Sequence, residues 1–101
     1  MFYANYTKPS GENVSRLYFS TKEYHRDTFN PETEIYSVIN FRVRGRTYRD
    51  RQADLCNTAR RWQYESAPGL SWNEIADVAD WFYAQGKRYG LLRDFREEAI
   101  I

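Results

Sequence analysis

The sequence predicts an α+β fold, in which a small antiparallel β-sheet in the N-terminal half is followed by two or three C-terminal helices. Two observations favour it. β-Branched and aromatic runs separated by turn residues dominate residues 1–46, and capping patterns with helical spacing follow over 47–101. The chain has 101 residues and shows no repeat or linker. We therefore expect a single domain over residues 1–101 with one modest core.

Three strands are expected in the N-terminal half. FYANYT at 2–7 and VSRLYFST at 14–21 flank the turn-forming segment KPSG at 8–11, which predicts a hairpin. A short helical turn is expected over 21–27. The third strand is IYSVINFRVR at 35–44, where alternation places four apolar residues on the core face: Ile35, Ile39, Phe41 and Val43.

Helix start signals are found in the C-terminal half. Thr47 and Asp50 fit the cap of a helix that runs to about residue 65. Ser71 and Glu74 form an S-x-x-E capping box for a second helix, and LLRDFREEAI at 91–100 fits a short last helix. Helical spacing predicts that the second helix buries Trp72, Ile75, Ala76, Ala79, Phe82 and Tyr83.

The apolar residues of this chain are unusually aromatic. Leu, Ile and Val together number 14, against nine Tyr, six Phe and three Trp. A domain of this size has little room for so many large rings, so we expect several of them on the surface, where aromatic side chains dominate binding energy. The alternative is that the tyrosines only border the core as amphipathic residues.

Charge and cysteine content exclude several classes of protein. The net charge of +1 argues against a nucleic-acid coat protein and against an acidic mimic of DNA. A single cysteine, Cys56, excludes an internal disulfide and a Cys-based zinc site, and it is consistent with a reducing compartment. Neither a leader-like N-terminus nor a long apolar run occurs, so we expect a cytoplasmic protein without membrane contact.

Residues suited to catalysis are scarce. His25 is the only histidine, which excludes a multi-His metal site. Cys56 lies at a helical position typical of a buried thiol, and a Cys-His pair with His25 is the weaker alternative. Asp77 and Asp80 are spaced as on a solvated helix face, and no Gly-rich phosphate loop or nucleophile elbow is present. We therefore expect no enzymatic activity, no metal and no cofactor.

An arginine-rich stretch, RVRGRTYRDR at residues 42–51, is the clearest charge feature. Its alternation predicts that one side of a hairpin, and the residues just beyond it, carry four candidate partner-binding side chains: Arg42, Arg44, Arg46 and Arg49. Three interpretations stay open. The arginines contact phosphates while Tyr36 and Tyr48 stack on bases, they contact an acidic protein surface, or they form a solvated strand face.

The segment SAPGLSWNE predicts a turn between two helices. A helix stop followed by a turn is by itself enough to explain Pro68 and Gly69. However, Ala67 and Gly69 are too small to shield the Pro68 ring, and Leu70 and Trp72 are close enough to act as anchors. An accessible X-Pro bond is also a suitable substrate or docking peptide for a peptidyl-prolyl isomerase. Ala67, Pro68, Gly69 and Trp72 are therefore candidate partner-binding residues.

In its size, its α+β plan and its Ala67-Pro68-Gly69 loop between C-terminal helices, the chain resembles the Abc-type anti-RecBCD proteins of lambdoid Salmonella phages. The resemblance implies a phage protein of the host bacterial cytoplasm that binds the host RecBCD helicase-nuclease through its RecC subunit. It would alter the nuclease activity and Chi response of RecBCD so that phage recombination proceeds, and a host prolyl isomerase would join at Pro68. Only the Pro68 loop carries over residue by residue.

The leading hypothesis is therefore a non-catalytic modulator that occupies a larger host enzyme and favours one of its functional states. Its expected contacts are Pro68, Trp72 and the arginines from Arg42 to Arg49. One alternative is a small nucleic-acid-binding regulator that uses the same arginines. Another is a phage inhibitor of a different host defence complex, such as restriction or CRISPR machinery.

Overall fold

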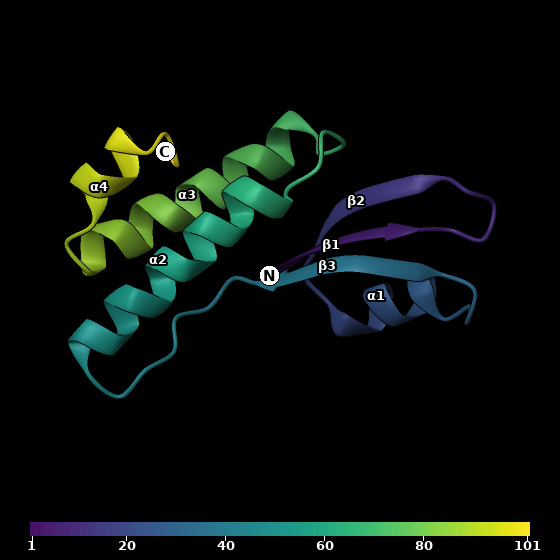
Figure 1. Cartoon of the computed structure of the whole chain (residues 1–101), viewed down its shortest axis with the longest axis horizontal. Helices are drawn as coiled ribbons and strands as arrows, with labels where there is room; N and C mark the ends of the chain where they lie inside the picture. The colour runs from purple at the N-terminus through teal and green to yellow at the C-terminus, as the bar shows by residue number, and fades with distance from the viewer.

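The sheet has three antiparallel strands in the order β2-β1-β3, and the computed structural model describes all residues from 1 to 101. The strands are β1 (Phe2–Thr7), β2 (Asn13–Tyr18) and β3 (Glu34–Asn40), and α1 (Thr21–Thr28) lies between β2 and β3 in the chain. Figure 1 shows α1 packed beside the sheet on one side of the molecule. The N-terminal half is thus the small antiparallel sheet that the sequence predicts.

Helices make up the C-terminal half: α2 (Tyr48–Glu65), α3 (Trp72–Arg88) and α4 (Leu92–Glu97). Figure 1 shows α2 and α3 side by side, with α4 next to α3 and far from the sheet. None of these helices combines the length and the apolar character that a membrane crossing requires. The α+β fold class is therefore confirmed.

The central strand β1 is covered on both faces, which divides the core into two clusters. On one face, Tyr3 joins a larger cluster that includes Leu55 of α2, Phe82 of α3 and Phe95 of α4. On the other face lies a smaller cluster against α1, formed by Phe2, Ala4, Tyr6 and Tyr18. β1 is therefore a nearly continuous run of buried residues, whereas buried and exposed residues would alternate along a strand with one solvated face.

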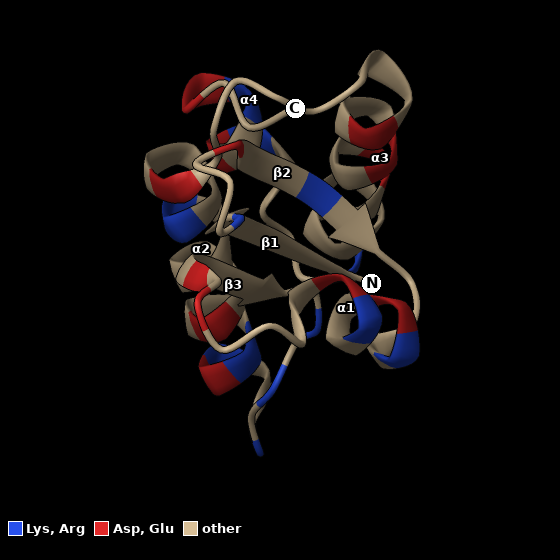
Figure 2. Cartoon of the chain, turned by 90° about the vertical axis from the view of Figure 1, so that its right-hand side faces the viewer, with Lys and Arg blue, Asp and Glu red and all other residues tan.

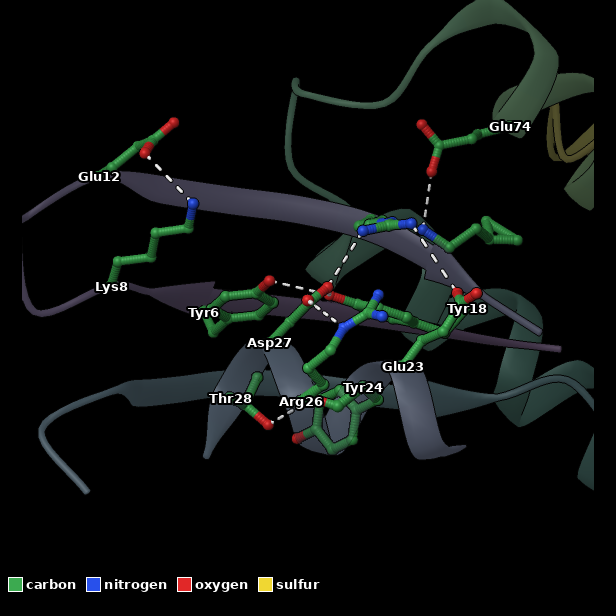
Figure 3. Close-up of polar contacts among 12 residues, drawn as sticks. Tyr6, Lys8, Glu12, Tyr18, Glu23, Tyr24, Arg26, Asp27, Thr28 and Glu74 are labelled. Carbon is green, nitrogen blue, oxygen red and sulfur yellow. Dashed lines mark hydrogen bonds and ion pairs between the residues drawn. The ribbon is translucent and has the colours of Figure 1, made fainter. Parts of the chain in front are cut away.

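A hydrogen-bonded network satisfies the polar atoms of the smaller cluster (Figure 3). The hydroxyl groups of Tyr6 and Tyr18 are 2.8 Å apart, and the Tyr18 hydroxyl donates to Asp27 over 2.8 Å. Arg16 of β2 pairs with the same carboxylate at 3.0 Å. Burial, together with these hydrogen bonds, raises the pKa of the Tyr18 phenol above its usual value. The network therefore joins α1 to the sheet through groups that are all paired.

The predicted ends of the second and third strands are wrong, and β1 explains both errors. β1 begins at Phe2, which pairs with Tyr18 on one side and with Asn40 on the other. Beyond these positions no strand residue is left to pair with, so β2 ends at residue 18 and β3 at residue 40 instead of 21 and 44. Arg42 and Arg44 therefore lie in a connection to α2 that pairs with no strand, and the predicted arginine hairpin does not form.

Ile35 is also not a core residue. The register of β1 and β3 shifts between Asn5, which pairs with Ser37, and Tyr6, which pairs with Ile35, so that Tyr36 is left as the extra residue. A bulge of this kind changes the face to which the preceding residues point. Ile35 is 50% exposed as a result.

The inward face of α3 agrees with the prediction at Phe82 and differs from it at the other positions. The buried residues are Val78, Phe82 and Gly86, whereas Trp72 is 85% exposed and Tyr83 is 46% exposed. Ile75 and Ala76 are exposed as well, and Ala79 is half-buried. The apolar residues of α3 occupy neighbouring stripes, and the packing of α4 selects one of them. A Cβ atom at Gly86 would lie 2.9 Å from the Phe95 ring, so only glycine allows this close approach.

Candidate docking site at the Pro68 loop

The segment between α2 and α3, residues 66–71, is here called the Pro68 loop. It lies where the helices meet the sheet, close to β2 (Figure 1). Pro68 and Gly69 are exposed, Ala67 is half-buried, and the Ala67–Pro68 peptide bond is trans. The side chain of Pro68 is thus exposed, as the sequence predicts, and the structure adds that it lies at a junction between the two halves of the fold.

A buried tyrosine fixes the first half of this loop. The Tyr3 hydroxyl accepts a hydrogen bond from the Ala67 N–H over 2.9 Å and donates one to the carbonyl of Glu65 over 3.2 Å. The N–H of Ser66 closes the end of α2 by donating to the carbonyl of Trp62. No sequence signal marks Tyr3 for this role, because its partners are more than 60 residues away.

A carboxylate fixes the second half of the loop. Glu74 accepts hydrogen bonds from the N–H of Ser71 and, with its other oxygen, from the N–H of Leu17 in β2 at 2.7 Å. Figure 3 shows Glu74 reaching from α3 to this strand. Burial alone would raise the pKa of the Glu74 carboxyl, but these hydrogen bonds and nearby Arg16 outweigh it and lower the pKa. The predicted capping box forms, and it also ties α3 to the sheet.

An apolar groove of about 600 Å³ opens on one side of the loop. Trp62 forms part of its wall, and Trp72 beside it leaves 85% of its surface exposed. Its other lining residues are Ser66, Ala67, Pro68, Gly69, Leu70 and Ile75. Exposed apolar side chains gathered around a hollow are typical of a surface that another protein covers.

A more polar groove of about 550 Å³ opens between the loop and the sheet. The loop residues Ala67, Pro68 and Gly69 line it together with residues of the sheet: Asn5, Glu12, Asn13, Val14, Ser15 and Tyr36. Asn5 pairs with Ser37, whose buried hydroxyl has no hydrogen-bond partner. The Pro68 loop is therefore a ridge between an apolar and a polar hollow.

The arginines of residues 42–49 do not join this ridge. Arg42 and Arg44 line a small hollow with Thr58 and Arg61, where the Arg44 N–H donates to Asp54. Arg46 and Arg49 lie at the N-terminal end of α2. The Pro68 loop follows the C-terminal end of this 18-residue helix, which is about 27 Å long at 1.5 Å per residue. The length of α2 thus separates Arg46 and Arg49 from the Pro68 loop, whereas Arg42 and Arg44, near Arg61 in the second half of α2, simply line neither groove beside the loop.

Groups with catalytic potential are not concentrated near the loop. Cys56 packs against the larger cluster, and burial raises the pKa of its thiol, which disfavours the reactive thiolate. No group of three or more His, Cys, Asp or Glu side chains is arranged to hold a metal ion. What the site offers is an apolar hollow and a backbone that hydrogen bonds hold at both ends.

Comparisons with protein-family models, with curated proteins and with solved structures found no match to this chain.

Proposed function

We propose that this protein is a non-catalytic modulator that binds a larger protein through the Pro68 loop and the apolar groove beside it. The observation that carries the proposal is the 85% exposure of Trp72 next to a groove lined by Trp62, Leu70 and Ile75. A tryptophan exposed beside a hollow is an unfavourable surface for an isolated protein, and a favourable anchor once a partner covers it.

Hydrogen bonding at both ends of the loop supports the same function. Hydrogen bonds to Tyr3 at its start and to Glu74 at its end hold the backbone on both sides of Pro68. A loop that is already ordered loses little conformational entropy when a partner binds it, so more of the contact energy appears as affinity. The mechanism of modulation is differential binding, in which the protein stabilises one functional state of its target.

The proposed target is the host RecBCD complex in the bacterial cytoplasm, contacted at its RecC subunit. The support for this choice is the resemblance of the Ala67-Pro68-Gly69 loop to that of Abc-type anti-RecBCD proteins. Binding would redirect nuclease activity and Chi response in favour of phage recombination. A host prolyl isomerase is the second proposed partner, because the Pro68 ring is exposed on its ridge.

Co-elution of the purified protein with purified RecBCD in size-exclusion chromatography tests the proposal. Wild-type protein is expected to co-elute, and Trp72→Ala to lose most of this binding. Tyr64→Ala is the matched control, because Tyr64 is a 92% exposed ring outside the groove. Pro68→Ala is expected to reduce recovery of the isomerase while circular dichroism shows an unchanged fold.

Each outcome has a distinct meaning. Absence of co-elution by the wild-type protein overturns RecBCD as the target. Equal loss of binding in the Trp72 and Tyr64 variants overturns the apolar groove as the contact. Unchanged isomerase recovery by Pro68→Ala shows that this proline only terminates α2.

A further inference from the structure

A second hollow, at the other end of α2, is lined by arginine and tyrosine. It measures about 330 Å³ and lies between the first turn of α2 and the end of α3. Its lining residues are Arg46, Thr47, Tyr48, Arg51, Arg88 and Tyr89. None of these three arginines forms an ion pair, and no carboxylate lines the hollow.

Two glycines allow the walls of this hollow to approach each other. Gly45 has φ +143°, and a Cβ atom there would lie 2.8 Å from Asp50, so glycine lets the chain fold back onto the first turn of α2. Gly90, with φ +70°, ends α3 so closely against Tyr48 that an added Cβ would lie 3.3 Å from its hydroxyl. Gln52 then joins α2 to the end of α3 by donating to the Tyr89 carbonyl over 2.7 Å.

The buried side chain of Tyr89 organises the arginines around it. Arg51 donates to the Gly45 carbonyl over 3.1 Å and to the Tyr89 hydroxyl over 3.4 Å. The guanidinium carbon of Arg88 lies over the Tyr89 ring at 5.6 Å from its centroid. Two of the three cations are therefore held in place before any ligand arrives, which lowers the entropy that binding costs.

The charged side chains that line this hollow are all basic. Figure 2 shows acidic and basic residues side by side on α1 and α2. Arg46, Arg51 and Arg88 line the hollow without an acidic side chain among them, and Asp50, on the same turn of α2, is not a lining residue. Guanidinium groups match phosphate oxygens in geometry as well as in charge, so a phosphate group is the anion that relieves this repulsion best.

We propose that this hollow binds the phosphate of a nucleotide, with the base stacked on Tyr48. The Tyr48 ring is 55% exposed and lies 5.7 Å from the Tyr89 ring, so its free face is available at the edge of the arginine cluster. Stacking on tyrosine beside a basic groove is how single-stranded nucleic acids are bound without sequence preference. The nucleotide comes either from a single strand or from the free pool.

The position of the hollow makes it independent of the Pro68 loop. The two sites lie at opposite ends of α2, about 27 Å apart along its axis at 1.5 Å per residue. A ligand in the hollow therefore leaves the Pro68 loop free to bind a protein. One molecule of this chain is thus able to hold a protein and a nucleotide at the same time.

Fluorescence anisotropy with a labelled short oligothymidylate at several salt concentrations tests this proposal. One phosphate neutralised in the hollow predicts a slope of about −0.7 in log affinity against log salt, because each neutralised phosphate of a single strand contributes about that much. Arg46→Gln combined with Arg88→Gln is expected to weaken binding at low salt and to flatten that slope. Tyr48→Ala is expected to weaken binding without changing the slope, because it removes stacking and no charge.

The matched control is Arg26→Gln combined with Arg93→Gln, which removes the same charge from exposed positions outside the hollow. This control is expected to bind as the wild type does. Equal weakening in both double variants, or no binding by the wild type at low salt, overturns the proposal. Circular dichroism confirms folding, and Arg46→Gln alone, in the connection before α2, replaces the double variant if that variant unfolds.

Competition by unlabelled thymidine monophosphate distinguishes the two sources of the nucleotide. The hollow is assigned to a free nucleotide if the monophosphate displaces the labelled oligothymidylate and the same concentration of inorganic phosphate does not. If the monophosphate does not displace the oligothymidylate, the hollow is assigned to single-stranded nucleic acid. Displacement by inorganic phosphate as effective as that by the monophosphate overturns the role of Tyr48 and leaves only an anion site.

Discussion

The hydroxyl group of Tyr3, in the first strand, accepts a hydrogen bond from the backbone N–H of Ala67 over 2.9 Å. The same hydroxyl donates to the carbonyl of Glu65, so one fully buried side chain holds the chain on the approach to Pro68. The conformation of the exposed loop therefore depends on a residue of the sheet, and the docking site is shaped by contact between the two halves of the fold.

Tyr3→Phe is expected to loosen the Pro68 loop. The substitution keeps the ring and removes the hydroxyl, which leaves the N–H of Ala67 without its partner and costs about 1–3 kcal/mol of unfolding free energy. Urea denaturation measures this loss, and amide hydrogen exchange at Ala67 is expected to accelerate. Tyr64→Phe, at a 92% exposed position, serves as the control and is expected to change neither quantity. Unchanged exchange at Ala67 would contradict the role of Tyr3.

Glu74→Gln is expected to cost about 1–2 kcal/mol near neutral pH, because a charged acceptor of two backbone N–H groups is replaced by a neutral one. The pKa of Glu74 is lower in the folded protein than in the unfolded chain. The stability that it contributes is therefore present above the ordinary glutamate pKa of about 4.3 and is lost as the pH falls through the lower folded value.

Urea denaturation across this acidic range measures the pH dependence of Glu74. The difference in stability between wild type and Glu74→Gln is expected to shrink as the pH falls below about 4. Glu97→Gln, an exposed position on α4, is expected to follow the wild type. A difference that stays constant with pH would show that Glu74 stabilises the fold without its charge.

Phe82→Ala is expected to destabilise the protein by about 3–5 kcal/mol, because it opens a cavity in the larger cluster. The Phe82 ring is fully buried and contacts the rings of Phe41 and Phe95. Tyr83→Ala, the next residue on α3 and 46% exposed, is expected to cost much less. Thermal unfolding compares the two, and equal losses would contradict the inward face of α3 described above.

Tyr18→Phe is expected to destabilise the protein at neutral pH by about 1–3 kcal/mol, because it breaks the hydrogen bonds to Asp27 and Tyr6. The pKa of Tyr18 is raised in the folded state, first by burial. Its contribution is therefore complete below the ordinary tyrosine pKa of about 10 and is lost as the pH rises above it. Denaturation at increasing alkaline pH is expected to bring wild type and variant together, and a constant difference would contradict this.

Local signals predicted the helices well. Both hydrogen bonds of the Ser71–Glu74 capping box form, and the Thr47 side chain accepts from the Asp50 N–H as its spacing predicts. That several aromatic rings lie on the surface was predicted from composition, and the rings of Phe29 and Tyr64 are among them. These features depend on neighbours a few residues away or on the number of large side chains, and both are readable in one sequence.

The ends of the second and third strands, and the inward face of α3 apart from Phe82, were predicted wrongly. The run of 35–44 alternates well enough for a longer strand, but β1 offers no partner beyond Asn40. The apolar residues of α3 fit more than one stripe, and the contact of Gly86 with Phe95 selects the stripe that is buried. In each case the deciding residue belongs to another element.

By itself, the sequence determined the fold class, the helix starts and the proline turn at Pro68, because each depends on backbone preferences and hydrogen bonds within a few residues. Only the tertiary structure decided that Tyr3 and Glu74 hold the Pro68 loop, and that Arg88 joins Arg46 and Arg51 in one hollow. These groups come from distant parts of the chain. Their meeting depends on how helices and sheet pack, which local preferences do not specify.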